Sequence, residues 1–113
     1  MNEIAKYTEI VHDENFSFAE GERIRPGEFH TFLRGGVPRR VEFLCPCGCG
    51  SECPTRVVPA GAPHDERQWE YKAGGHLIHP SVHWTSGCMA HFFINMDGTV
   101  VWCGDSPRPN KGT

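Results

Sequence analysis

Short hydrophobic runs separated by glycine and proline extend along this chain from end to end. Runs rich in β-branched and aromatic residues predict strands, and alternation between apolar and polar positions indicates that one face of a strand is buried. No segment shows the 3.6-residue periodicity of an amphipathic helix, and 13 glycines and 9 prolines disfavour long helices. The pattern predicts a small single-domain fold, mostly antiparallel β, with at most one short helix. The expected strands cover residues 7–11, 28–33, 41–44, 56–58, 68–71, 90–95 and 99–102.

The clearest turn signal lies between the last two expected strands. Asp97-Gly98 joins them, and Asp-Gly is a strong signal for a tight hairpin turn. In the strand before this turn, Phe92 and Ile94 are expected to face one way and Phe93 the other, because side chains alternate along a strand. The two strands are therefore predicted to form an antiparallel hairpin.

Composition agrees with a single globular unit. The chain has 113 residues, of which 38% are hydrophobic, and its mean hydropathy is -0.45. A chain of this length is one domain by the usual size range and has a modest core. We expect this domain to span residues 1–113, with its core at about 27–103 and a flexible tail at 105–113.

Charge and segment hydrophobicity exclude several classes of partner. The formal net charge is -3 and the isoelectric point about 6.1, so the chain lacks the basic footprint of a nucleic-acid-binding domain. No stretch approaches the ~20 apolar residues of a membrane span, and residues 1–10 do not form a signal peptide. We predict a cytoplasmic protein without nucleic-acid or membrane partners. In a reducing compartment clustered cysteines favour metal binding over disulfides, although an even count of six leaves an exported disulfide protein as the alternative.

Four of the six cysteines form the strongest chemical signal. Three alternate in the Cys-Pro-Cys-Gly-Cys-Gly run at 45–50, and the fourth lies three residues before His91. Zinc takes four ligands in tetrahedral geometry, and thiolate-rich zinc sites are usually structural. The two glycines of the run permit the sharp turn that closely spaced ligands require. The sequence therefore predicts a structural zinc site with four ligands: Cys45, Cys47, Cys49 and Cys88.

Other ligand sets fit the same spacing. Cys45 and Cys49 alone can chelate, with the intervening thiol turned into the core, and His91 can take the place of a thiolate. Without a metal ion, the clustered thiols would be buried packing residues, since free cysteine is among the most buried residue types. Cys53 and Cys103 lie outside the pattern, and we interpret both as packing residues.

Ser81 and His91 can form a catalytic pair. A serine nucleophile needs a base within roughly 2.6–3.2 Å and donors for the developing oxyanion. Ser81 follows a proline and His91 lies at the start of the next expected strand, so the connection between them can return the imidazole to the hydroxyl. Glu42, Asp97 or Asp105 can orient that histidine, and the sequence does not choose among them.

The remaining parts of such a site stay open at this point. Backbone amides near Gly74-Gly75 or Gly87 are candidates for the oxyanion donors. In the competing interpretation Ser81 only caps a turn, since serine beside proline is common in turns and the Gly-x-Ser-x-Gly motif is absent. A third interpretation is an open, catalytic zinc site with His91 as one ligand.

Four blocks, taken in order, resemble a family of bacterial and phage proteins. They are Cys-Pro-Cys-Gly-Cys-Gly at 45–50, Pro80-Ser81, Gly87-Cys88-x-x-His91-Phe92-Phe93-Ile94 and Asp97-Gly98-x-Val100-Val101-Trp102. The resemblance covers roughly residues 27–103. This family was long catalogued as a domain of unknown function, and its genes are often found beside bacterial ubiquitin-like conjugation genes.

The resemblance implies a zinc-containing serine peptidase, a hydrolase that processes or removes a ubiquitin-like modifier. Under this hypothesis Ser81 is the nucleophile and His91 its base, while the clustered cysteines hold zinc structurally. The protein partner would be the modifier or its conjugates. The reaction would be acyl transfer, with backbone amides holding the oxyanion.

A competing hypothesis is a non-catalytic zinc-binding module that recognises a protein partner, for example as a phage counter-defence factor. It predicts no labelling by a serine-reactive phosphonate and an exposed apolar patch near Trp69 or Trp84. Nucleic-acid binding through a zinc knuckle is disfavoured by the acidic charge balance.

Overall fold

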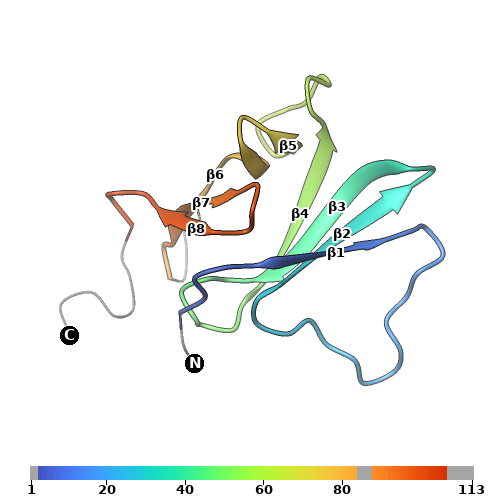
Figure 1. The fold of residues 1–113 in the computed structure, drawn as a ribbon, viewed down its shortest axis with the longest axis horizontal. Coiled ribbons are helices and arrows are strands. Elements are labelled where there is room, and N and C mark those ends of the chain that lie inside the picture. Colours follow the sequence, from blue (N-terminus) through green and yellow to red (C-terminus); the bar gives the residue numbers. More distant parts are fainter. Residues whose placement is uncertain (1–2, 84–87, 107–113) are drawn as a thin grey trace.

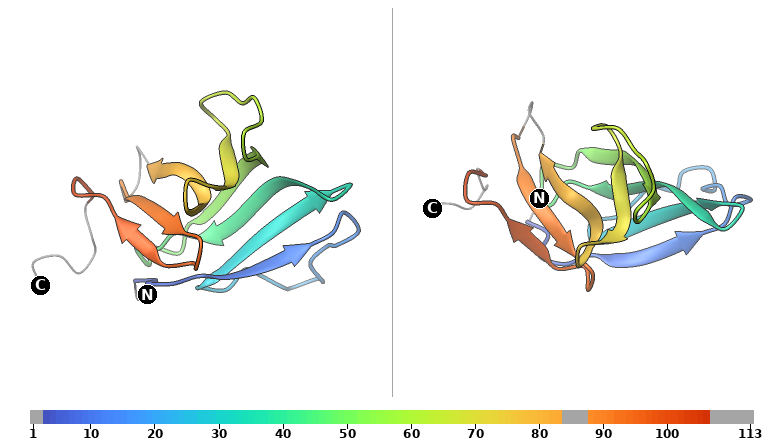
Figure 2. Two further views of the ribbon diagram at one scale, coloured as in Figure 1. Left: turned by 45° about the horizontal axis from the view of Figure 1, so that its top comes forward. Right: turned by 90° about the horizontal axis from the view of Figure 1, so that it is seen from above.

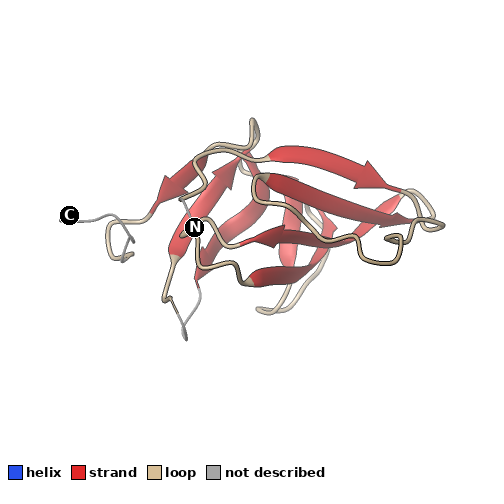
Figure 3. Ribbon diagram, turned by 90° about the horizontal axis from the view of Figure 1, so that it is seen from below, coloured by secondary structure: helices blue, strands red, loops and turns tan. Residues whose placement is uncertain are grey.

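The regular secondary structure of the described residues consists of strands alone. The structure is a computed structural model that describes residues 3–83 and 88–106. Eight strands form one sheet in which each pairs with the next along the chain (Figures 1 and 3). They are β1 (Thr8–His12), β2 (Glu28–Arg34), β3 (Val37–Leu44), β4 (Glu52–Pro59), β5 (Trp69–Ala73), β6 (His76–His83), β7 (His91–Asn95) and β8 (Val100–Trp102). The prediction of a mostly β fold with little helix is confirmed. Over these residues no helix has the length and hydrophobicity to cross a bilayer.

The sheet curls into two halves that meet at β4. Strands β1–β4 form the first half and β4–β8 the second, and Figure 2 shows the second half turning back toward the first. Every neighbouring pair is antiparallel except β1 with β2 and β4 with β5. The predicted antiparallel character therefore holds for most of the sheet, and the curl encloses the core between the inner faces of both halves.

Aromatic side chains join the two halves in this core. The ring of Phe43 on β3 meets the ring of Phe92 on β7 edge to face, with 6.4 Å between their centroids. Tyr7, just before β1, packs edge-on against Phe43 at 5.5 Å and donates its hydroxyl proton to the carbonyl of Leu44. Further buried side chains come from both halves: Phe29, Val41, Val57, Ile78, Val82 and Ile94.

The structure contains all the expected strands and one that the hydrophobic pattern missed. The missed strand is β6, which contains Pro80 and three histidines. Proline supplies no N–H to a ladder and is therefore found at edges and irregular positions of sheets. The pairing of β6 with β7 shifts register between Ile78 and Val82, on either side of Pro80. Ser81 therefore lies on a strand and not in a turn.

The predicted hairpin between β7 and β8 is confirmed. Gly98 has a φ of 90°, and a Cβ atom there would lie 1.9 Å from the carbonyl oxygen of Tyr7, so the turn requires glycine. Phe92 and Ile94 are buried and Phe93 is half-buried, which agrees with the predicted alternation of faces.

Residues 4–7 link this hairpin to the turn that carries three of the clustered cysteines. The N–H of Ile4 donates to the carbonyl of Pro46 at 2.8 Å, and the N–H of Tyr7 donates to the carbonyl of Gly98, also at 2.8 Å. Two loops from distant parts of the chain are thereby fixed to the same short segment.

Candidate functional site

The turn between β3 and β4 brings three thiols together. Cys45 directly follows β3, and its N–H donates to the carbonyl of Ser51 at 2.9 Å, which closes the turn. Gly48 and Gly50 have φ values of 89° and 83°, the left-handed conformation that the sequence predicted for closely spaced ligands. The N–H of Cys49 points at the sulfur of Cys47 at 3.3 Å. This backbone geometry directs several donors toward one small volume.

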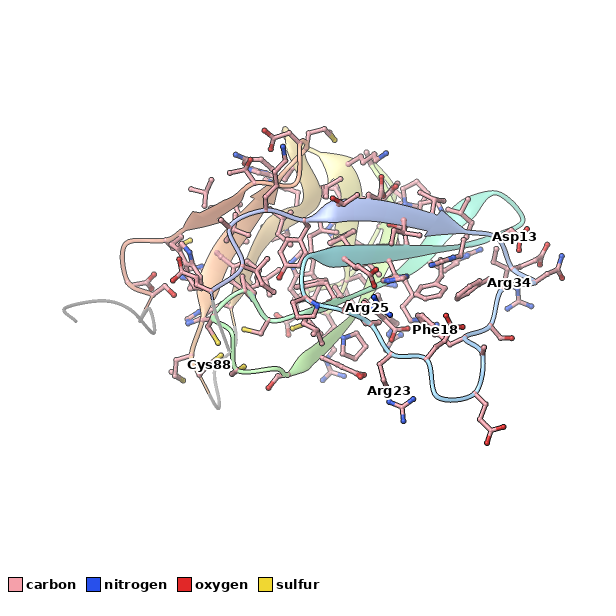
Figure 4. All side chains as sticks on the ribbon, turned by 60° about the horizontal axis from the view of Figure 1, so that its bottom comes forward. Asp13, Phe18, Arg23, Arg25, Arg34 and Cys88 are labelled. Atoms are coloured by element: carbon pink, nitrogen blue, oxygen red, sulfur yellow. The ribbon has the colours of Figure 1, made fainter. Side chains whose placement is uncertain are left out.

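Cys88, from the segment before β7, completes a group of four thiols. Its sulfur lies 3.6 Å from that of Cys45, which is 3.4 Å from that of Cys47. The fourth sulfur belongs to Cys49, and all four lie within 4.8 Å of one another. Figure 4 shows sulfur atoms gathered beside Cys88. Four sulfurs at about 2.3 Å from one tetrahedral zinc ion are about 3.8 Å apart, so the thiols present fit that ion.

The pKa values of the four thiols are shifted in different directions. A hydrogen bond with Cys53 and burial raise the pKa of the Cys45 thiol, and burial raises that of Cys47 and Cys88. Burial acts in the same direction on Cys49, but hydrogen bonds with Ser51 outweigh it and lower its pKa to about 6. A metal ion binds thiolates, so its binding here releases protons and depends on pH.

The two cysteines outside the sequence pattern have different surroundings. Cys53 is 1% exposed, and its thiol donates to the carbonyl of Ser51, next to the cluster. Cys103 is half-buried after β8, and its N–H donates to the carbonyl of His91 at 2.9 Å. Cys53 therefore packs beneath the thiol cluster, while Cys103 lies beside the histidine.

A second group of side chains lies across β6, β7 and the segment after β8. The hydroxyl of Ser81 is 2.9 Å from Nε2 of His91, and Nδ1 of His91 is 2.8 Å from a carboxylate oxygen of Asp105. An imidazole that carries its proton on Nδ1 donates to Asp105 and leaves Nε2 to accept the Ser81 proton. The hydrogen bond from His91 lowers the pKa of Asp105 below its ordinary value. Serine, histidine and carboxylate are thus connected in the order of a catalytic triad.

Strand pairing explains why these three residues meet. His83 on β6 is the register partner of His91 on β7, which places Ser81 within reach of the same imidazole. The N–H of His91 also donates, at 2.9 Å, to the hydroxyl of Ser106, which lies beyond β8. Ser106 is 3% exposed, so this bond anchors the segment that presents Asp105.

The other two acidic candidates have different partners. Glu42 pairs with Arg40 at 2.7 Å, and Asp97 accepts from the N–H of Thr99 at 2.9 Å in the hairpin turn. Among the three carboxylates considered from the sequence, Asp105 is the one that contacts His91. Nothing in its local sequence marks it, because Asp105 lies 14 residues beyond His91.

Of the candidate oxyanion donors named from the sequence, the Gly74-Gly75 pair does not lie beside Ser81. Gly74-Gly75 forms the turn before β6, at the end of that strand opposite to Ser81. Gly87 and Trp84 lie outside the described residues. Trp69 is half-buried, and its indole N–H donates to the carbonyl of Ser81 at 3.2 Å, so this side chain supports the strand that carries the serine.

No sequence pattern predicted the contact between His83 and His91. Its ring stacks on the ring of His91 with 4.2 Å between centroids and an angle of 14° between planes. Because His83 and Ser81 are two positions apart on β6, both project toward the side of the strand that meets His91. The hydrogen bonds to Ser81 and Asp105 fix the edges of the imidazole, and His83 covers one of its faces.

His91 also belongs to a group of metal-type donors, separate from the thiol cluster. Donor atoms of His91, Cys103 and Asp105 lie within 4.8 Å of one another. A metal ion on this imidazole would use a nitrogen that contacts either Ser81 or Asp105. Metal ligation and proton transfer therefore exclude each other at His91.

The chain matches the model of a known protein family. A family model described as "Bacterial ubiquitination-like system serine protease (BubE)" matches residues 16–103. No curated protein and no solved structure matches the chain. The matched region contains all four blocks on which the family resemblance was based, and the resemblance is confirmed.

Proposed function

This chain belongs to the BubE family of bacterial ubiquitination-like system serine proteases, and we propose that it hydrolyses an amide or isopeptide bond formed by a ubiquitin-like modifier. The observation that carries the proposal is the hydrogen-bonded chain from Ser81 through His91 to Asp105. It joins a nucleophile, a base and an orienting carboxylate at distances that suit proton transfer. The substrate is then a precursor or a conjugate of the modifier.

The first half-reaction begins at the Ser81 hydroxyl. Its oxygen attacks the carbonyl carbon, its proton moves to Nε2 of His91, and the electrons of the carbonyl double bond move to the oxygen. When the tetrahedral species collapses, the carbon–nitrogen bond breaks and Nε2 returns the proton to the leaving amine. Asp105 holds the Nδ1–H and stabilises the imidazolium that forms between these events. The product is an acyl group on Ser81.

The second half-reaction uses water in place of Ser81. Nε2 of His91 accepts a proton from water, whose oxygen attacks the acyl carbon. Collapse breaks the bond to the serine oxygen, and the proton passes to Ser81. The released carboxylate is the mature C-terminus of the modifier, and His91 returns to its neutral form.

The proposal assigns zinc a structural place at Cys45, Cys47, Cys49 and Cys88. Two observations support it: the close approach of the four sulfurs and the burial of Cys45 and Cys47. A bound zinc ion would fix the turn after β3 to the segment before β7, which leads directly to His91. Its chemistry there is limited to holding these two segments together.

Substitution of Ser81 tests the nucleophile assignment. We expect Ser81→Ala to reduce cleavage of a modifier precursor by about 10⁴-fold or more, since loss of a triad nucleophile removes the covalent route. Ser17→Ala is the matched control, because Ser17 is exposed on the segment between β1 and β2. Precursor cleavage is followed by electrophoresis and mass spectrometry.

Retention of cleavage by Ser81→Ala would reject the assignment. If wild-type protein neither cleaves precursors or conjugates nor reacts with a serine-directed phosphonate, while it still binds the modifier, the protein is the non-catalytic zinc-binding module. Circular dichroism of both variants shows whether the fold is retained.

A further inference from the structure

A large open cavity lies away from Ser81, beside the turn between β2 and β3. Its volume is about 890 Å³, and its lining comes from β2, β3, β4 and the residues that follow β1 and precede β5. In Figure 1 the β2–β3 turn lies at the right of the view, whereas β7 and β8 lie at the left. The triad does not use this cavity. Its charged lining residues are Asp13, Glu14, Arg34, Arg39, Arg40 and Arg56.

Strand register creates the basic wall of the cavity. Phe32 on β2 pairs with Arg40 on β3, and Arg40 pairs with Arg56 on β4, so these three side chains share one face of the sheet. The guanidinium of Arg40 lies over the Phe32 ring, 4.5 Å from its centroid, and its Nε binds Glu42 at 2.7 Å. Arg40 is therefore held in place by a ring and a carboxylate.

The other three arginines have no such neutralisation. Arg34, Arg39 and Arg56 are exposed, and none has an ion pair with another residue in the part of the chain that the structure describes. Arg40 and Arg56 stand directly opposite each other, an arrangement of like charges that destabilises a strand pair. Carboxylates from a ligand would relieve this repulsion.

The charge of the cavity contrasts with the charge of the whole chain. Four arginines face two carboxylates, Asp13 and Glu14, whereas the chain has a formal net charge of -3. Figure 4 shows Asp13 and Arg34 together at the same end of the molecule. Because the arginines outnumber the carboxylates, the lining attracts an acidic ligand, and Asp13 and Glu14 oppose it with a smaller repulsion.

Apolar side chains complete the lining. Phe16 and Phe32 line the cavity with Val57, and the Phe16 ring stacks on His12 with 3.7 Å between centroids. Phe16, which follows β1, is therefore fixed by the strand itself. An aromatic or aliphatic side chain of a ligand can pack here. A free phosphate or a nucleic-acid backbone has no such side chain.

We propose that this cavity binds an acidic protein segment in which an aromatic or aliphatic residue is flanked by carboxylates. The arginines would pair with the carboxylates, and the central side chain would pack against Phe16 and Phe32. Arginine suits this role because its planar group binds carboxylates through two hydrogen bonds. The further assignment of this segment to the protease substrate rests on the proposed function.

One peptide bond and one hydrogen bond connect the cavity lining to Ser81. Gln68 lines the cavity, and the next residue, Trp69, donates to the carbonyl of Ser81 at 3.2 Å. A substrate anchored in the cavity would therefore contact a segment that continues to the strand of the nucleophile. The cavity would act as a docking site outside the triad, which affects substrate binding more than the chemical step.

Peptide binding tests the proposal without any need for catalysis. The probe is a fluorescein-labelled nine-residue peptide with four glutamates on each side of one phenylalanine, and the protein is full-length Ser81→Ala. Anisotropy should rise on binding, and the Kd should weaken at least about 10-fold when NaCl is raised from 50 to 300 mM. The same peptide with glutamine for glutamate, or alanine for phenylalanine, should bind at least about 5-fold more weakly.

Substitutions locate the binding site. Arg39→Gln together with Arg56→Gln should weaken binding by at least about 10-fold, whereas Asp13→Asn should strengthen it. Arg23→Gln is the matched control, because Arg23 is an exposed arginine that donates to the neighbouring Glu22 carbonyl and does not line the cavity. Thermal melting should show no loss of stability on Arg56→Gln, since the variant removes a repulsive pair.

Three results would overturn the proposal: equal binding by the arginine double variant, a loss on Arg23→Gln as large as the loss on the double variant, or displacement of the peptide by an equal concentration of nine-nucleotide oligo-dT. The last result would assign the cavity to nucleic acid.

Kinetics separate this inference from the proposed function. The arginine double variant should raise the KM for a modifier conjugate and leave its kcat within about 2-fold, while hydrolysis of a small ester is unchanged. If Ser81 proves not to be a nucleophile but the peptide still binds, the protease proposal fails and the cavity proposal stands. An unchanged KM with measurable kcat would instead reject the cavity as a substrate-docking site.

Discussion

The thiol cluster and the Ser81–His91–Asp105 chain approach each other in sequence at Cys88 and His91 but differ in burial. Cys45 and Cys47 are 1% and 6% exposed, whereas the side chain of Asp105 is 66% exposed and that of His91 is 20% exposed. Four like donors suit an ion that stays bound, and here Cys45 and Cys47 are buried, Cys88 is half-buried and Cys49 is exposed. A half-exposed set of three unlike groups suits proton transfer to a ligand that enters and leaves. This difference supports the proposal that the thiol cluster maintains the fold and that the Ser81–His91–Asp105 chain carries the chemistry.

Removal of metal should produce the largest effect and should act on the fold. Structural zinc contributes on the order of 10 kcal/mol or more to folding in small domains, so strong chelator or Cys47→Ser should unfold the protein. Circular dichroism and thermal melting measure this loss. Cys103→Ser is the control, since Cys103 lies outside the four-thiol group and should leave the chelator-free melting curve nearly unchanged. An unchanged melting temperature in chelator would contradict the claim that a metal ion at the thiol cluster maintains the fold.

Asp105→Asn should act on the chemistry and spare the fold. Asparagine offers no charge to the imidazolium and does not hold the same His91 tautomer, so we expect a fall of about 10²–10³-fold in kcat. This is less than the loss for a buried triad aspartate because Asp105 is exposed. Precursor cleavage gives the rate, and an unchanged metal content and melting temperature show that the thiol cluster is intact. A loss below about 3-fold would mean that Asp105 does not orient His91.

Excess zinc should affect the two regions in opposite ways. The first equivalent should stabilise the protein at the thiol cluster. A further equivalent can bind His91, Cys103 and Asp105, whose donor atoms lie within 4.8 Å of one another. We expect this second ion to inhibit cleavage at least about 10-fold, because a ligated imidazole cannot accept a proton. Cys103→Ala should weaken the inhibition, and equilibrium dialysis should show fewer than two ions bound. Activation by the second ion would favour a catalytic metal centre.

His83→Ala should have a smaller effect on the chemistry. His83 stacks on one face of His91, and its loss gives the imidazole more rotational freedom. We expect kcat to fall about 3–10-fold while KM changes little, since ring position and not substrate contact is altered. His83→Phe restores a flat ring and should recover most of the rate. If phenylalanine is no better than alanine, stacking is not the means by which His83 acts.

Glu9 provides a prediction remote from both regions. Burial raises the pKa of Glu9, but hydrogen bonds from Tyr71, Thr31 and Lys72 outweigh it, so the net pKa lies below its ordinary value. A carboxylate with a depressed pKa stabilises the fold above its unfolded-state pKa, and this stability is lost as the pH falls through its folded-state pKa. Glu9→Gln should therefore lower stability by about 1 kcal/mol at neutral pH and by less below about pH 4.

Urea unfolding at several pH values measures this difference. Metal content and cleavage by the folded Glu9→Gln protein should equal those of wild type. If the difference in unfolding free energy between wild type and Glu9→Gln stays constant down to pH 3, the charge of the Glu9 carboxylate does not stabilise the fold.

The two regions also differ in how far the sequence could predict them. The closely spaced cysteines and glycines at 45–50 predict a turn directly, because residues adjacent in the chain are also adjacent in space. The contact of His91 with Ser81 depends on β6, which the hydrophobic pattern missed because Pro80 interrupts it. Its contact with Asp105 depends on Ser106, whose buried hydroxyl anchors the segment after β8. Most strands followed from local composition, whereas their register and the curl of the sheet depend on contacts such as that between Phe43 and Phe92.

Native mass spectrometry after treatment with a fluorophosphonate tests the central claim most directly, because one spectrum reports both regions. The claim is that a closed thiol site retains zinc while a separate serine reacts. We expect one adduct on Ser81 in a protein that still carries one zinc ion, and no adduct on Ser81→Ala. An adduct elsewhere, no adduct at all, or a folded protein without metal would contradict it.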